Sequence, residues 1–280
     1  MSENTGMNDL NTHFLITTVL PDIQGSHDLR ALAIERVGIR GIKHPIHVQS
    51  GSGSFPTVAQ FEMDVALPAD QKGTHMSRFV HLLQDEQGVY SISKIVGMAK
   101  KMLPLLQAKH GRIQMQYTHF EKKSAPVSSV ESWMDYEVTY RAEAKQMPDE
   151  SVDVDLYLQA IVPVMSLCPC SKEISEYGAH NQRSHVTILV KVDPATNLNV
   201  EELLRIAETE ASSELWAILK RPDEKWVTER AYETPKFVED LVRDVATRLK
   251  HDERILSLVV EAENFESIHN HSAFARISLP

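Results

Sequence analysis

The chain has 280 residues, of which 42% are hydrophobic and 24% charged, a balance that excludes a disordered tail and a fibrous protein. Its 39 acidic side chains outnumber the 29 basic ones, and the net charge of −10 argues against a general nucleic-acid binder. The sequence contains no run near the roughly 18 apolar residues of a membrane span, and the apolar stretch from Phe14 to Leu20 lacks a basic leader. We therefore expect a cytoplasmic protein that binds neither nucleic acid nor membrane.

Hydrophobic patterns in the first half predict one strand, two helices and two further strands. Residues 1–41 carry few periodic signals and are expected to form an N-terminal arm. After this arm, apolar residues alternate with polar ones in the predicted strands and recur every three or four residues in the predicted helices. Gly111 is the expected end of the second helix. In chain order, the predicted elements cover residues 59–67, 79–83, 92–106, 113–117 and 130–144.

The second half repeats this order. One helix is predicted to begin at Asn199, with Glu202 at its third position, and another at Thr234, with Pro235 at its first. The repeat indicates a duplicated α+β unit in which strand hairpins flank a helix pair, with a boundary near residues 147–151. Strands are predicted over residues 152–160, 186–192, 255–261 and 272–278.

One connection between strands concentrates reactive side chains. Residues 166–185 read SLCPCSKEISEYGAHNQRSH and contain both cysteines of the chain, two histidines, a lysine and an arginine. Cys168 and Cys170 are one residue apart, a spacing that very rarely permits a mutual disulfide. Thiolate and imidazole ligands favour zinc or another late transition metal, and an added carboxylate makes room for manganese or iron. By spacing alone, packing of such cysteines in the core is the more frequent arrangement, and the nearby histidines favour a metal site.

Three later parts of the sequence contain further side chains that could bind a metal or accept a hydrogen bond. Residues 221–233 are highly charged, and their composition predicts a solvated loop with acids that cap the next helix. Glu239 lies one turn into an apolar helix, where it either favours the positive helix end or points an acceptor into a pocket. Residues 261–271 place His269 and His271 beside carboxylates, a composition typical of solvent turns but also of metal sites and acid–base pairs.

Five motifs together resemble GTP cyclohydrolase I of type IB, the bimodular branch of the tunnelling-fold superfamily. They are GTHMSRF, SLCPCSKEIS, GAHNQRSH, RPDEKWVTERAYETPKFVED and ENFESIHNHSA, and the resemblance extends from about Pro45 to the C-terminus. It implies tandem tunnelling-fold modules over residues 42–148 and 149–280, each an antiparallel sheet with a helix pair on one face. The second module would carry the metal site. It also implies a barrel closed by oligomerisation, most simply a homotetramer with active sites at subunit interfaces.

The resemblance also implies the metal site. Cys168, Glu224 and His269 would bind one divalent metal per active site, either Zn²⁺, Mn²⁺ or Fe²⁺. His180 would act with Cys168 in catalysis, as a direct ligand, a ligand through water, or the group that transfers protons. Asp223 and Glu229 remain alternatives for the carboxylate. Cys170 is expected to point to the opposite face if its segment is extended.

The implied reaction converts GTP and water to 7,8-dihydroneopterin triphosphate and formate, the first step of folate and pterin biosynthesis. The enzyme would be a hydrolase acting on cyclic amidine C–N bonds. Glu239 would anchor the guanine, because one carboxylate can accept the N1–H and 2-amino protons as a bidentate pair. The triphosphate requires cations, drawn from more than one subunit. The candidates are Lys72, Arg78, Lys172 and Arg183.

Two other functions compete with this interpretation. A nitrile reductase acting on a deazaguanine would use the cysteine as a covalent nucleophile and NADPH as hydride donor, but it would leave His180, Glu224 and His269 unexplained. A non-catalytic metal- or nucleotide-binding module would bind metal without turnover of GTP.

Overall fold

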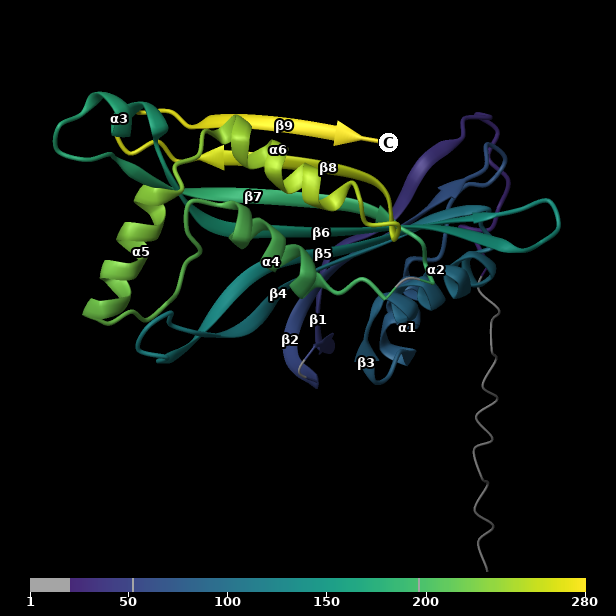
Figure 1. Cartoon of the computed structure of the whole chain (residues 1–280). Coiled ribbons are helices and arrows are strands. Elements are labelled where there is room, and N and C mark those ends of the chain that lie inside the picture. Colours follow the sequence, from purple (N-terminus) through teal and green to yellow (C-terminus); the bar gives the residue numbers. More distant parts are fainter. Residues whose placement is uncertain (1–20, 52, 196) are drawn as a thin grey trace, which may run out of the picture.

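The computed structural model describes residues 21–51, 53–195 and 197–280. One nine-stranded sheet forms its centre, with the strand order β3-β1-β2-β4-β5-β6-β7-β8-β9 (Figure 1). The first half comprises β1 (Ile34–Ser50), β2 (Gly53–Leu67), α1 (Met76–Asp85), β3 (Val89–Tyr90), α2 (Ile92–Leu106), β4 (His110–Ser124) and β5 (Glu131–Gln146). The second half comprises β6 (Val152–Leu167), α3 (Pro169–Ile174), β7 (Asn181–Val192), α4 (Val200–Glu210), α5 (Arg221–Glu233), α6 (Val238–Leu249), β8 (Ile255–Asn264) and β9 (Ala273–Leu279).

The two halves share this sheet without a break. Strands β5 and β6 pair antiparallel from Glu137–Ile161 to Gln146–Val152, and the predicted boundary falls in the turn that joins them. The Met147 N–H donates to the Ser151 carbonyl at 2.8 Å and closes this turn. The halves are therefore connected by a continuous ladder of backbone hydrogen bonds.

The helices cover one face of the sheet. Helices α1 and α2 pack on the first half, and α4 and α6 pack on the second, over one hydrophobic core that spans both halves. On the opposite face, polar side chains pair across strands; for example, Arg36 and Arg112 both donate to Asp64. This arrangement confirms the predicted α+β class with a helix pair on one face of each half. No helix in the described part of the chain is long and apolar enough to cross a membrane.

The first half differs from prediction at two points. Strand β1 begins at Ile34, so the end of the predicted arm belongs to the sheet, while residues 1–20 of that arm lie outside the described residues. Gly38 of this strand is required, because a Cβ there would lie 1.9 Å from the Met63 carbonyl oxygen. Helix α2 ends at Leu106 and is capped by Gln107, which has the left-handed conformation with φ of 54°, whereas Gly111 belongs to β4.

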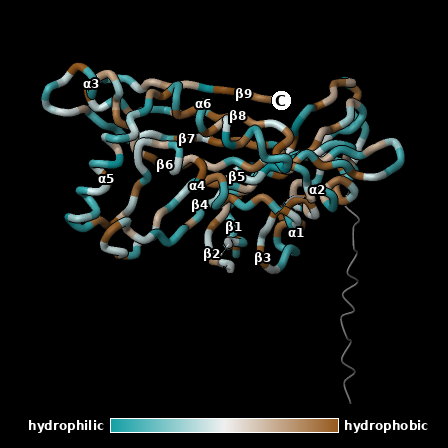
Figure 2. Tube along the Cα trace, viewed as in Figure 1, coloured by the Kyte–Doolittle hydropathy of each residue, from teal (hydrophilic) through white to brown (hydrophobic). Residues whose placement is uncertain are grey.

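The second half contains a helix that composition did not predict. Residues 221–233 form α5 instead of a loop, and Figure 2 shows that this helix is mostly hydrophilic. Helix α6 begins at Val238 rather than near Thr234. The predicted capping of α4 is confirmed, since the Asn199 N–H donates to the Glu202 carboxylate at 2.9 Å.

Candidate functional site

The segment that contains both cysteines lies at one end of the sheet (Figure 1). Strand β6 ends at Leu167 and β7 begins at Asn181, directly opposite it in the antiparallel ladder. The short helix α3 and the turn after it connect these two strands. The backbone N–H of Lys236, just before α6, donates to the Leu167 carbonyl at 3.1 Å. The start of α6 therefore lies beside the start of the cysteine segment.

Cys168 and His180 are held together by a small network of hydrogen bonds. The Cys168 N–H donates to the His180 carbonyl at 3.1 Å. The Ser171 hydroxyl donates to the Cys168 carbonyl at 3.1 Å and accepts from the His180 N–H at 3.2 Å. Cys168 is the half-buried N-cap of α3, whereas Cys170 is exposed within this helix; both are free thiols. The segment of Cys170 is helical rather than extended, so the expected strand alternation does not apply, and the two cysteines differ instead in exposure.

The imidazole of His180 is oriented through one nitrogen. Its Nδ1 lies 3.1 Å from the Gln182 side-chain oxygen and 3.2 Å from the Ser267 hydroxyl. Donation from Nδ1 to Gln182 would leave Nε2 unprotonated and available for a metal or a proton. Sequence reasoning missed Ser171, Gln182 and Ser267, because hydroxyl and amide side chains in a polar loop carry no distinctive pattern.

The remaining predicted metal ligands lie on other elements. His269 belongs to the exposed turn between β8 and β9, where its ring stacks on His271 with centroids 5.1 Å apart. Glu224 is exposed on the first turn of α5. Within the described residues of a single chain, no three Cys, His, Asp or Glu side chains form a group that could hold a metal ion. One chain thus brings together Cys168 and His180, but not Glu224 or His269 with them.

The three candidate carboxylates of α5 have different surroundings. Asp223 is fully buried and accepts from the Val127 N–H at 2.9 Å, and from the N–H and hydroxyl of Ser128 at 2.8 and 2.6 Å. Burial acts to raise the pKa of Asp223, but the hydrogen bonds from Ser128 and nearby backbone N–H groups hold it well below its ordinary value. Glu229 pairs with Lys225 at 2.7 Å. Glu224 alone of the three has no side-chain partner in the described chain.

The predicted substrate-binding residues are divided between the two ends of the molecule. Glu239 is exposed at the start of α6, and Arg183 is exposed on β7. The Lys172 ammonium donates to the Tyr232 carbonyl and lies 4.3 Å from the ring centre of Tyr232. These three residues belong to the cysteine end of the sheet.

The other two cations lie elsewhere. Arg78 of α1 donates to the Leu105 carbonyl at 3.0 Å, and Figure 1 shows α1 far from α3. Lys72 lies in the connection just before α1 and is exposed. Neither Arg78 nor Lys72 shares the cysteine end of its own chain.

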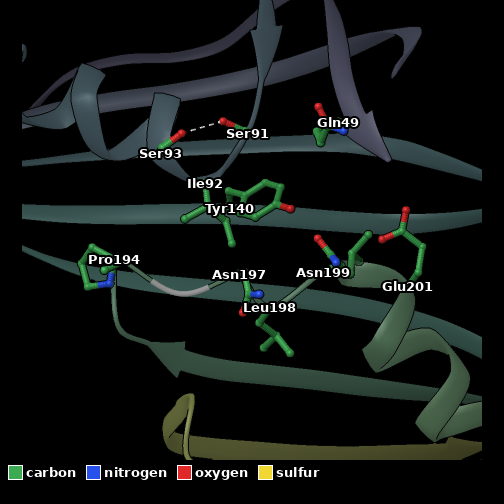
Figure 3. Close-up of a pocket in the computed structure, with 12 residues that line it drawn as sticks. Gln49, Ser91, Ile92, Ser93, Tyr140, Pro194, Asn197, Leu198, Asn199 and Glu201 are labelled. Atoms are coloured by element: carbon green, nitrogen blue, oxygen red, sulfur yellow. Dashed lines mark hydrogen bonds between the residues drawn. The ribbon is translucent and has the colours of Figure 1, made fainter. Parts of the chain in front are cut away.

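A cavity of about 290 Å³ lies between the N-terminus of α2 and the N-terminus of α4 (Figure 3). The N-terminus of α2, the connection from β7 to α4, and Tyr140 of β5 line it. Glu201 at its edge accepts from the Gly51 N–H at 2.8 Å. None of the predicted site residues lines this cavity, so the cysteine end and the cavity are separate features.

Comparisons with known proteins agree on one family. The model of type I GTP cyclohydrolase FolE2 matches residues 20–275. GTP cyclohydrolase FolE2 of Polynucleobacter asymbioticus is 65% identical over 269 residues, which cover 96% of this chain and 99% of the relative. The enzyme of the same name from Cupriavidus necator is 56% identical, with 97% of each chain covered.

Solved structures support the fold. A hyperthermostable mutant of Bacillus sp. TB-90 urate oxidase superimposes with a TM-score of 0.53 at 9% identity, covering 88% of this chain and 98% of that one. Urate oxidase from Bacillus subtilis gives 0.53 at 8% identity, with 87% and 98% covered. At such low identity these similarities concern the fold alone, and they confirm the predicted tunnelling fold. Closure of a barrel by several copies stays a prediction.

Proposed function

The chain belongs to the type I GTP cyclohydrolase FolE2 family, and from this premise we propose how its residues bind and transform the substrate. It is a GTP cyclohydrolase I of folate biosynthesis, which converts GTP and water to 7,8-dihydroneopterin triphosphate and formate. The observation that supports the location of the active site is the hydrogen-bonded network of Cys168, Ser171 and His180 at one end of the sheet.

We infer that this enzyme depends on one divalent metal per active site. The donor set fits such an ion, because Cys168 is a free, half-buried thiol, and the exposed Glu224 and His269 offer a carboxylate oxygen and an imidazole nitrogen. Glu224 and His269 would complete the ligand set, with the missing groups supplied across a subunit interface. When bound, a Zn²⁺, Mn²⁺ or Fe²⁺ ion supplies Lewis acidity that activates water for attack.

His180 supplies proton transfer in this proposal. Water must add to C8 of guanine, which is a poor electrophile until N7 carries a proton. With Nδ1 oriented by Gln182 and Ser267, Nε2 of His180 can hold that proton and deliver it to N7. The hydrogen bonds of Ser171 fix the backbone of His180 relative to Cys168. The group that transfers protons and the thiol that binds the metal would therefore act in the same part of the active site.

Glu239 binds the substrate in this proposal. Its carboxylate would accept the N1–H and the 2-amino group of guanine, a pattern that adenine does not present. Lys172 and Arg183 of the same end would contact the triphosphate, while Arg78 and Lys72 would come from another subunit. A cytoplasmic homotetramer with interfacial active sites accounts for this division.

The experiment compares the two cysteines as a matched pair. Purified protein is stripped with a chelator, reloaded with Mn²⁺ and incubated with GTP, and pteridine absorbance, formate release and bound metal are measured. Cys168→Ala should lose both metal and turnover, whereas Cys170→Ala should keep much of both. Full activity and normal metal content in Cys168→Ala would refute the ligand assignment.

A further inference from the structure

Helix α5 has little packing of its own. Only Asp223, Val227 and Ala231 are buried, and the rest of its surface is largely hydrophilic (Figure 2). A helix with so narrow an apolar face gains little from burial. Its placement therefore depends on the contacts at its two ends.

At its N-terminus, α5 is held by the tip of the β4–β5 hairpin, residues 124–130. Asp223 accepts three hydrogen bonds from this tip, through the Val127 and Ser128 N–H groups and the Ser128 hydroxyl, and a fourth from the Lys220 N–H at 2.8 Å. The tip is itself closed by donation from the Ala125 N–H to the Val130 carbonyl at 2.9 Å. Both carboxylate oxygens of Asp223 are thus occupied inside the protein.

The segment that leads into α5 is fastened to the same hairpin. The indole N–H of Trp216 donates to the Ser124 carbonyl at 3.0 Å, and its ring meets Trp226 of α5 edge to face, with centroids 6.1 Å apart. Lys123, the residue before Ser124 in β4, pairs with Glu214 at 3.1 Å. The hairpin tip and the entry to α5 therefore form one connected unit.

At its C-terminus, α5 is tied to the cysteine segment. The Lys172 ammonium donates to the Tyr232 carbonyl, and Lys236 just beyond the helix donates its N–H to Leu167. Helix α5 thus spans from a hairpin of the first half to the Cys168 segment of the second half (Figure 1).

We propose that the β4–β5 hairpin tip positions Glu224 for metal binding by clamping its neighbour Asp223. Consecutive helical residues are turned by roughly 100° about the axis. The hairpin tip holds the Asp223 carboxylate inside the protein. The side chain of Glu224, one residue further along the helix, is therefore directed toward the solvent. The first module, which carries none of the proposed metal ligands, thereby controls one of them. This inference rests on the proposed role of Glu224 as a ligand.

Two variants test the clamp, and Ser128→Ala is also made in a Glu224→Gln background. Ser128→Ala removes one hydroxyl donor and keeps both backbone donors, and Asp223→Asn replaces an acceptor with an amide N–H that faces the Lys220 N–H. Ser129→Ala is the matched control, since it removes a neighbouring hydroxyl of the same tip that has no side-chain hydrogen bond in the described chain. Mn²⁺ alone is titrated into each metal-free full-length protein, with free Mn²⁺ followed by electron paramagnetic resonance and thermal unfolding recorded in parallel.

We expect Ser128→Ala and Asp223→Asn to weaken Mn²⁺ affinity by about 10- to 100-fold, the usual effect of losing groups that orient a ligand. Ser129→Ala should bind as the unmodified protein does. At saturating Mn²⁺, kcat of Ser128→Ala should return to within about twofold of normal, because the ligands themselves are intact. In a Glu224→Gln background, Ser128→Ala should cause no further loss, since no carboxylate remains to be positioned.

Different results separate failure of the clamp from failure of the ligand assignment. If Ser128→Ala and Asp223→Asn lower the unfolding temperature but leave Mn²⁺ affinity unchanged, while Glu224→Gln weakens it, the tip is merely structural and the clamp is refuted. If Glu224→Gln binds Mn²⁺ normally, Glu224 is not a ligand. The proposed role of the hairpin tip in positioning Glu224 is then refuted as well. Additive losses in the double variant would likewise refute action through Glu224.

Discussion

Replacement of Lys123 by methionine should destabilise the protein in a way that depends on pH. The Lys123 ammonium lies 2.7 Å from the Glu208 carboxylate, and each side chain is only 10% exposed. The Tyr136 hydroxyl also donates to Glu208 at 2.8 Å. Methionine keeps the stem of the lysine but removes its charge, so the Glu208 carboxylate would remain buried without its cation.

The loss of stability in Lys123→Met should be large, because the ion pair between Lys123 and Glu208 is buried. Loss of one partner from a buried ion pair costs about 3–5 kcal/mol in free energy of unfolding, because the other charge is left uncompensated. Burial raises the pKa of Glu208 above its ordinary value of 4.5, against the lowering effects of Lys123 and Tyr136. Without Lys123 this pKa should rise further.

The raised pKa of Glu208 determines how the free energy of unfolding changes with pH. Above about pH 4.5 the unfolded chain loses the Glu208 proton before the folded protein does, so stability falls as pH rises through the window up to the raised folded pKa. The difference between Lys123→Met and the unmodified protein should therefore be small at pH 4 and full at pH 8. Urea unfolding at fixed protein concentration measures it.

A second substitution provides the control. Glu208→Gln in the Lys123→Met background removes the buried charge while its amide oxygen can still accept from Tyr136. The double variant should recover most of the lost stability at pH 8. Equal destabilisation at pH 4 and pH 8, or a double variant as unstable as Lys123→Met alone, would refute the reasoning.

Three further predictions concern the active site. Glu239→Gln should weaken GTP binding by about 30-fold or more with normal metal content, because the mismatched amide costs about 2–4 kcal/mol, and unchanged equilibrium binding would contradict the anchor role. His180→Ala should still bind GTP but slow formate release by about two to four orders of magnitude; rapid release in metal-loaded protein would contradict proton transfer, and loss of metal would make His180 a ligand. Sedimentation should show a homotetramer whose activity falls on dilution, and a fully active monomer would exclude interfacial sites.

Much of the fold was predictable from hydrophobic periodicity, and the exceptions have a physical cause. Strands such as residues 59–67 and 186–192 alternate because one face packs on helices. Helix α5 has only Val227 and Ala231 as buried apolar residues, so it presents no amphipathic pattern. Its start is stabilised by hydrogen bonds from Val127 and Ser128, about a hundred residues earlier in the chain, and no local pattern reveals such a contact.

The same distinction applies to the candidate site. The proximity of Cys168 and His180 was predictable, because both lie in one connection between neighbouring antiparallel strands. Asp223 and Glu224 could not be distinguished by sequence, since they are adjacent acids in one charged run. Their difference depends on which of them faces the distant hairpin tip.

The unbroken ladder between β5 and β6 restricts how this enzyme can move. Proteins built from two units often close on a substrate by bending at the linker, but here the link is a tight turn flanked by strands paired on both sides. Bending there would break a row of backbone hydrogen bonds in the middle of a sheet. If the active site lies at the cysteine end and at a subunit interface, as proposed, loops such as the turn between β8 and β9 and the association of subunits would govern access to it, while the sheet itself stays rigid.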